Sequence, residues 1–149
     1  MLKNKRYLLI ISCSKRKKTN LLKAPAIELY DGPFYKILRK CAPSNLDVLI
    51  ISAKYGLISA NEIIELYDLK MTPKRAVELA PYVRSRLESW LSKWHYEKIF
   101  IMLGKVYMSA LNDSWRLLEN YDIEVGRGQI GERLHTLKKW LKILGGCDE

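Results

Sequence analysis

The sequence has few cysteines and no long apolar run. Its three cysteines, Cys13, Cys41 and Cys147, include no CxxC pair and are odd in number. This pattern argues against a disulfide framework or a four-ligand zinc site and favours reduced thiols in a cytosolic protein. No apolar run approaches the roughly 20 residues of a membrane helix, and the basic N-terminus lacks a signal-peptide cleavage pattern. We therefore expect a cytoplasmic protein that has no membrane contact, metal or cofactor.

Acidic residues are absent from residues 1–25, which contain eight Lys or Arg, and the whole chain carries a net charge of +10. Such a basic segment favours a polyanionic partner, nucleic acid first and a nucleotide second. The alternative is a solvated basic surface that has no partner. Glutamine is also scarce, while Lys, Glu, Ile and Tyr are common, a composition that leans towards a thermophile.

The apolar pattern predicts one α/β domain over residues 1–149. Short, continuously apolar runs at 6–12, 47–53 and 98–103 are typical of strands buried on both faces, and 121–125 would be a shorter fourth strand. Helical patterns separate these runs. We expect a three-layer fold in which a mainly parallel four-stranded sheet has helices on both faces; the oligomeric state stays open.

The connections between these strands give further expectations. Residues 57–71 should form a loop with a helical turn near 61–66, and one helix should span 105–119. Asp31 would cap a helix that begins at Pro33, and Pro81 would kink or restart the helix that begins at Thr72-Pro73.

Polar and basic residues follow each predicted strand. Because ligands bind beyond the carboxyl ends of parallel strands, these residues should meet at one ligand-binding edge. The alternative is that loops simply collect polar residues. The four strand ends are Cys13-Ser14-Lys15, Lys54-Tyr55-Gly56, Gly104-Lys105 and Gly126-Arg127-Gly128.

Cys13 is the candidate nucleophile, because Lys15, Lys17 and their basic neighbours would favour the thiolate that attacks electrophiles. The alternative is an inert, packed cysteine. Lys54, directly after an apolar strand, would face the cleft and hold an anionic ligand or take part in catalysis. Asp68 is a candidate base or hydrogen-bond acceptor, or alternatively a turn cap.

The remaining candidates would bind the ligand. Residues 126–131 fit GxGxxG but lack the later strand and acid of a dinucleotide site, so Arg127 and Gly128 would hold a phosphate or form only a tight turn. Tyr30 and Tyr55 would stack on a base or simply pack, and Tyr67 would bind the ligand from within reach of the same edge. Ser14, Gly56 and Gly104 would line the same cleft. His95 and His135 have no ligand spacing, and we assign them no chemistry.

The same stretches carry a resemblance over about residues 8–135. SCSKRK, ELYDGPFYKILRK, ISAKYGLI and YDLKM resemble a family of small uncharacterised domains with CSxxK, LYxGxxF, SAKYGL and YDxxL motifs, except that Met71 replaces the usual Leu. The CSxxK opening is also similar to one in archaeosine synthase, in a domain whose fold resembles uracil-DNA glycosylase. That similarity implies a compact three-layer α/β fold and chemistry on nucleobases.

Two functions therefore stay open. The first is an enzyme that acts on a nucleobase, nucleotide or nucleic acid, with glycosidic-bond chemistry as one option. The second is a non-catalytic nucleic-acid-binding module. A deep pocket that joins Cys13 and Lys54 would favour the enzyme, and a broad basic face would favour the module.

Overall fold

A computed structural model describes residues 5–147. Its elements, in chain order, are Tyr7–Ser12 (β1), Lys23–Pro25 (β2), Ala26–Leu29 (α1), Pro33–Cys41 (α2), Leu46–Ser52 (β3), Gly56–Ser59 (β4), Ile63–Glu65 (β5), Pro73–Lys93 (α3), Lys98–Met102 (β6), Lys105–Met108 (α4), Ser109–Leu111 (the 3₁₀ helix η1), Trp115–Leu118 (α5), Ile123–Val125 (β7) and Ile130–Ile143 (α6).

The main sheet has five strands in the order β4-β3-β1-β6-β7. Strands β3, β1, β6 and β7 are parallel to one another, and β4 pairs antiparallel with β3. The α/β class is confirmed, but the sheet is mixed and larger than the four-stranded sheet we expected. A separate two-stranded sheet pairs β2 with β5.

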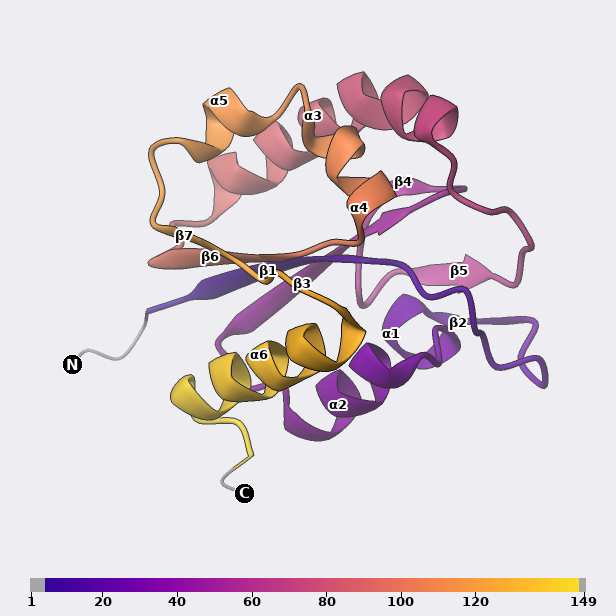
Figure 1. Cartoon of the computed structure of the whole chain (residues 1–149), viewed down its shortest axis with the longest axis horizontal. Coiled ribbons are helices and arrows are strands. Elements are labelled where there is room, and N and C mark those ends of the chain that lie inside the picture. The colour runs from indigo at the N-terminus through magenta and orange to yellow at the C-terminus, as the bar shows by residue number, and fades with distance from the viewer. Residues whose placement is uncertain (1–4, 148–149) are drawn as a thin grey trace.

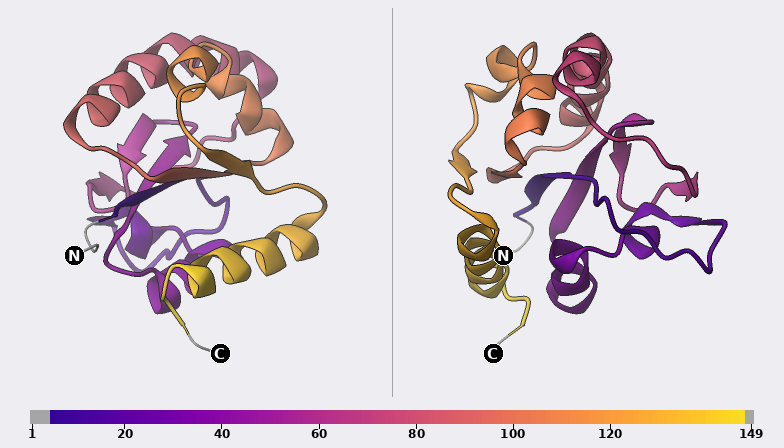
Figure 2. Two further views of the ribbon diagram at one scale, coloured as in Figure 1. Left: turned by 90° about the vertical axis from the view of Figure 1, so that its left-hand side faces the viewer. Right: turned by 45° about the vertical axis from the view of Figure 1, so that its right-hand side comes forward.

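Strand β1 explains why the apolar runs are continuous. Leu8 and Ile10 pack into the core on one face of the sheet, and Leu9 and Ile11 pack into the core on the other. Helix α3 with α4, η1 and α5 covers the first face, and α1, α2 and α6 cover the second (Figures 1 and 2). The sheet is therefore the middle layer of three, and β1 is its central strand.

The segment 57–71 is not the loop that we expected, because it contains β4 and β5. Gly56 begins β4 with φ +80°, a conformation that favours glycine, and its α-carbon lies against the ring of Tyr82. The chain therefore reverses next to β3, and a hairpin-type edge strand forms where the apolar pattern alone suggested a loop. The expected helix 105–119 is likewise divided into α4, η1 and α5.

The expected cap of α2 was wrong. The N-cap of α2 is Gly32, while Asp31 pairs instead with Arg39 at 2.6 Å. Helix α3 continues through Pro81 without a break. Proline has no backbone N–H, so the Val77 carbonyl, four residues earlier, has no helical donor. Both Pro81 and Val77 are exposed, and water can therefore bind this carbonyl.

The cysteines also differ from expectation, because Cys41 and Cys147 form a disulfide with a Cα–Cα distance of 4.9 Å. The end of α2 and the chain after α6 meet because the two helices pack side by side. Gly146 donates its backbone N–H to Leu141 and passes so close to the Cys41 carbonyl that a side chain there would clash. Of the described cysteines, Cys13 alone is free. Within residues 5–147, no helix has the length and apolar character needed to span a membrane.

The disulfide should contribute much of the stability, because it closes a loop across 106 positions of the chain. We predict that Cys147→Ser lowers the free energy of unfolding by about 2–5 kcal/mol. Urea denaturation with and without a thiol reductant measures this effect. The reductant should destabilise the parent protein and leave the variant unchanged; equal stability of the reduced and oxidised parent would contradict the prediction.

Candidate functional site

The carboxyl end of β1 places Cys13 at the edge of the sheet. The Cys13 backbone N–H donates to the Ile51 carbonyl at 2.9 Å and extends the pairing with β3 by one residue. Its half-buried Sγ lies 3.1 Å from the Tyr107 hydroxyl, which α4 supplies after β6. The thiol therefore lies between the ends of three neighbouring parallel strands.

The carboxyl end of β3 is organised by Ser52, which is fully buried. Its Oγ accepts the backbone N–H groups of Lys54 at 3.2 Å and Tyr55 at 3.0 Å, and it lies 3.0 Å from the Tyr67 hydroxyl. Arg75 fixes the same turn from α3 by donating Nε to the Ala53 carbonyl at 2.7 Å. This turn directs Lys54 towards the strand-end side.

Four tyrosines surround the free thiol, and we call Tyr30, Tyr35, Tyr67 and Tyr107 the tyrosine network. The hydroxyls of Tyr30 and Tyr67 are 2.7 Å apart, and Tyr35 donates to the Ser12 carbonyl at 2.8 Å. Burial raises the pKa of all four, and negative charge at Cys13 raises each pKa further. The four hydroxyls therefore stay protonated at neutral pH, and each is already engaged in a hydrogen bond: Tyr35 with Ser12, Tyr30 with Tyr67, and Tyr107 with Cys13.

Two lysines lie over the rings of this cluster instead of pairing with carboxylates. Lys17 Nζ lies 4.4 Å from the ring centroid of Tyr67, and Lys54 Nζ lies 5.9 Å from the same centroid and 5.3 Å from that of Tyr55. A backbone bridge between Lys17 and Tyr30 holds the basic loop in place. Among the described residues, neither lysine has a carboxylate partner within salt-bridge distance.

A pocket of about 310 Å³ opens beside Cys13. Ser14, Lys15 and Arg16 line one side, the start of α2 with Phe34 lines another, and Gly104, Ile130 and Arg133 complete it. None of these lining residues is acidic. The Arg133 guanidinium lies 5.5 Å from the Phe34 ring centroid, so the cation and the aromatic face are adjacent. A Cβ at Gly32 would lie 2.5 Å from the Ser14 hydroxyl, so a larger residue there would displace that side chain.

The structure brings most predicted site residues to one edge, but not all of them. Cys13, Lys17, Lys54, Tyr30, Tyr55 and Tyr67 lie in or around the tyrosine network; Ser14, Lys15 and Gly104 line the pocket; and Gly56 shapes the turn after β3.

Three predicted residues do not join the cluster. Arg127 and Gly128 are exposed on the loop before α6 and do not line the pocket. The N-terminal part of α6 contributes Ile130 and Arg133 in their place. Asp68 is exposed, and no side-chain hydrogen bond or ion pair to it occurs among the described residues. The catalytic role predicted for Asp68 therefore stays a prediction without a contact to support it.

Sequence reasoning missed Ser52, Tyr35, Tyr107, Phe34 and Arg133. Ser52 ends an apolar run and precedes a turn, which is the signal that could have found it. The other four lie on helices, where they resemble ordinary core or surface residues, so only the packing shows their position.

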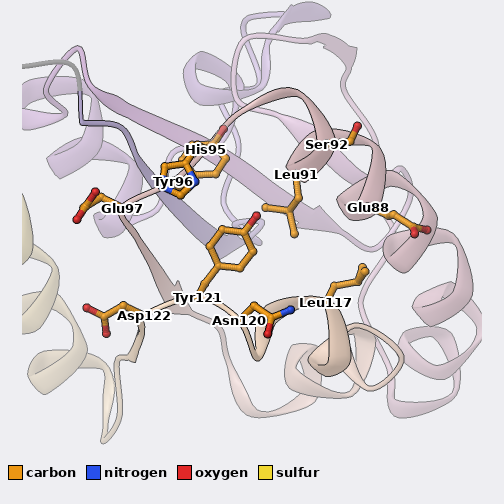
Figure 3. A pocket seen from close by; sticks show the side chains of 10 residues that line it. All are labelled: Glu88, Leu91, Ser92, His95, Tyr96, Glu97, Leu117, Asn120, Tyr121 and Asp122. Atoms are coloured by element: carbon orange, nitrogen blue, oxygen red, sulfur yellow. The ribbon is translucent and has the colours of Figure 1, made fainter.

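A second hollow, of about 550 Å³, lies at the opposite edge of the sheet between the end of α3 and the segment before β7 (Figure 3). Figure 3 shows Tyr121 pointing towards Tyr96 and His95. The Tyr96 hydroxyl accepts from Trp90 at 2.6 Å and donates to Asp47 at 2.6 Å. These bonds join α3 to β3 and give Tyr96 a structural role beside the hollow.

Tyr30 and Tyr35, both almost completely buried, should make the fold sensitive to alkali. Because burial raises their folded-state pKa, the folded protein keeps protons that the unfolded chain releases at about pH 10. Their stabilising effect is complete below about pH 10 and is lost as pH rises towards the folded-state pKa. Between these two pKa values, each proton that is released only on unfolding makes the free energy of unfolding fall by up to about 1.4 kcal/mol per pH unit.

Urea denaturation measures how the free energy of unfolding changes with pH in the parent and in Tyr35→Phe. The series should begin at about pH 9, roughly one unit below the reference pKa of tyrosine. The variant should show a shallower decline because it retains one proton fewer. Identical slopes would show that Tyr35 is not protonated as described.

Comparisons with known proteins add family and fold but no activity. No curated protein matches the sequence significantly. A crystal structure of AF0587, described as a protein of unknown function, superposes with a TM-score of 0.58 at 14% identity and covers 93% of this chain. The chain spans 45% of that protein, and at 14% identity the likeness shows the fold alone. A family model matches residues 8–139, and the chain therefore belongs to DUF6884, a family of unknown function.

Proposed function

We propose that the protein is an enzyme that acts on a nucleobase, nucleotide or nucleic acid at the carboxyl edge of its sheet, with glycosidic-bond chemistry as one option. The observation that carries this proposal is the position of Cys13. Its Sγ lies between the Tyr107 hydroxyl and a basic pocket that contains no acidic side chain among its lining residues.

The pocket has the chemistry that a nucleotide requires. Its volume of about 310 Å³ is at the lower end of small-ligand sites. Lys15, Arg16 and Arg133 supply positive charge for a phosphate, and Phe34 supplies a flat apolar surface for a base. The similarity of the CSxxK opening to archaeosine synthase also supports a nucleobase as the reacting group.

Cys13 is the nucleophile candidate in this proposal, because thiolates attack electrophilic carbon efficiently. The Tyr107 hydroxyl can donate a hydrogen bond to the sulfur, while Tyr30, Tyr35 and Tyr67 make their hydrogen bonds to other partners. Lys17 and Lys54 add positive charge above Tyr67 and would attract an anionic ligand to the same edge. Asp68 would act as a base only if a bound ligand reached it.

A non-catalytic nucleic-acid-binding module is the second candidate, and two observations favour it. Lys54 does not line the pocket beside Cys13, so the described residues do not form the shared pocket that would favour the enzyme. Among the described residues, no carboxylate or imidazole lies within hydrogen-bond distance of Cys13. A general base that activates the thiol is therefore not evident in the structure. Measurements on Cys13 and on ligand binding separate the two candidates.

We predict that iodoacetamide modifies Cys13 in the folded protein and that a bound nucleotide slows the reaction. Cys13 is half-buried beside the pocket, whereas Cys41 and Cys147 are held in a disulfide. Peptide mass spectrometry after timed alkylation, with and without a panel of nucleoside mono- and triphosphates, measures both effects. Slow labelling that no nucleotide changes would remove Cys13 from the proposed site.

We also predict that Lys54→Ala weakens nucleotide binding by roughly ten- to a hundredfold, the value of one charge-assisted hydrogen bond. Lys54 is exposed and has no carboxylate partner among the described residues, so its removal should change the free energy of unfolding by less than about 0.5 kcal/mol. Titration calorimetry and thermal denaturation on the same variant measure both quantities.

Lys93→Ala is the matched control, because Lys93 is an exposed lysine at the far end of α3. The control should bind nucleotide like the parent. A Lys54→Ala variant that melts at a lower temperature but binds normally would give Lys54 a structural role instead.

A further inference from the structure

A second basic surface lies away from the strand-end pocket, in a groove between α2 and α6. Its volume is about 1,030 Å³. Ile37 and the Cys41–Cys147 disulfide contribute to its walls. Five exposed lysines surround it, two from α2 and three from α6: Lys36, Lys40, Lys138, Lys139 and Lys142.

In the part of the chain that the structure describes, the positive charge in this groove is uncompensated. No acidic residue lines it, and none of its five lysines has a carboxylate within salt-bridge distance among the described residues. Lys36 and Lys40 are four residues apart on one helix, and Lys138 and Lys142 are four apart on the other. Like charges at this spacing destabilise a helix. A bound polyanion would relieve the repulsion on both helices at once.

The shape of the groove selects the kind of polyanion. It is concave and lies between two helices that pack side by side, so it suits a single extended strand better than a flat bilayer or a convex duplex. Both helices begin at the strand-end pocket, where Pro33 and Ile130 line it, and both end near the disulfide. Cations therefore continue from Arg133 at the pocket along the groove.

We propose that the groove between α2 and α6 binds the phosphate backbone of a single-stranded nucleic acid. The lysines neutralise successive phosphates, and the strand runs along the helices in line with the pocket beside Cys13. The groove is a site of its own: its binding of a strand does not require that the strand-end pocket be catalytic.

Fluorescence anisotropy with a labelled single-stranded oligonucleotide of about 16 nucleotides tests this proposal. The variants are Lys138→Gln with Lys142→Gln, and Lys36→Gln with Lys40→Gln. Each pair should weaken binding about tenfold at about 50 mM salt and reduce the slope of log affinity against log salt by about 1.4, or about 0.7 per lost contact. Melting temperatures should equal that of the parent or lie slightly above it, because the substituted lysines are exposed and unpaired among the described residues and their removal relieves the repulsion along each helix.

The control pair is Lys74→Gln with Lys93→Gln on α3, which removes the same charge from the other face of the sheet. It should bind within about twofold of the parent. An equal loss in control and groove variants would reduce the effect to net charge and overturn the proposal. The proposal would also be overturned if both double variants of the groove bound the oligonucleotide normally while Lys54→Ala did not. The strand would then lie at the carboxyl edge of the sheet.

A polyglutamate peptide and phospholipid vesicles, each added to the bound oligonucleotide and each also measured alone, separate this ligand from other anions. A polyglutamate peptide that displaces the oligonucleotide at equal charge concentration would identify an acidic protein segment as the partner and overturn the proposal. Groove-dependent binding to phosphatidylserine–phosphatidylcholine vesicles, without oligonucleotide binding, would overturn it in favour of a membrane surface. Weak displacement by both competitors supports a nucleic-acid strand. Failure of nucleotide to protect Cys13 would leave the groove result intact.

Discussion

The burial of β1 on both faces is the constraint on which the rest of the structure depends. Leu8, Leu9, Ile10 and Ile11 are almost fully inaccessible to solvent, and parallel neighbours on each side satisfy their backbone groups. Such a strand can carry polar side chains only where it ends. Cys13 is therefore delivered to the edge of the sheet by the strand that the core most requires, and any ligand site at that edge inherits a rigid support.

The register of the parallel strands determines which side chains meet there. Ser12 pairs with Ile51, and Ile11 pairs with Met102, so β1, β3 and β6 end at nearly the same level. Ser52, Cys13 and the residues after β6 consequently converge although they are far apart in sequence. The ending of apolar runs predicted this convergence, and it accounts for most of the candidate site that the sequence could show.

The failures of the sequence reasoning have a common physical origin. Periodicity reports which residues are buried in one element, but it does not report which elements lie side by side. The antiparallel β4 depends on a left-handed turn at Gly56, and the Cys41–Cys147 disulfide depends on the packing of α2 against α6. Tyr107 and Arg133 likewise reach the site from helices whose sequences show only ordinary amphipathic patterns.

The scarcity of acidic partners links the two basic surfaces. Buried tyrosines near Cys13 keep their protons, so they offer the lysines above them only the weak attraction of aromatic rings. In the groove between α2 and α6, the lysines face an apolar wall and one another. A chain selected for stability alone would place carboxylates beside these cations, as it does for Arg39 and Lys98 elsewhere. Within residues 5–147 both surfaces lack compensating carboxylates, which costs stability, and the polyanionic ligand proposed along α2 and α6 would explain why that cost is retained.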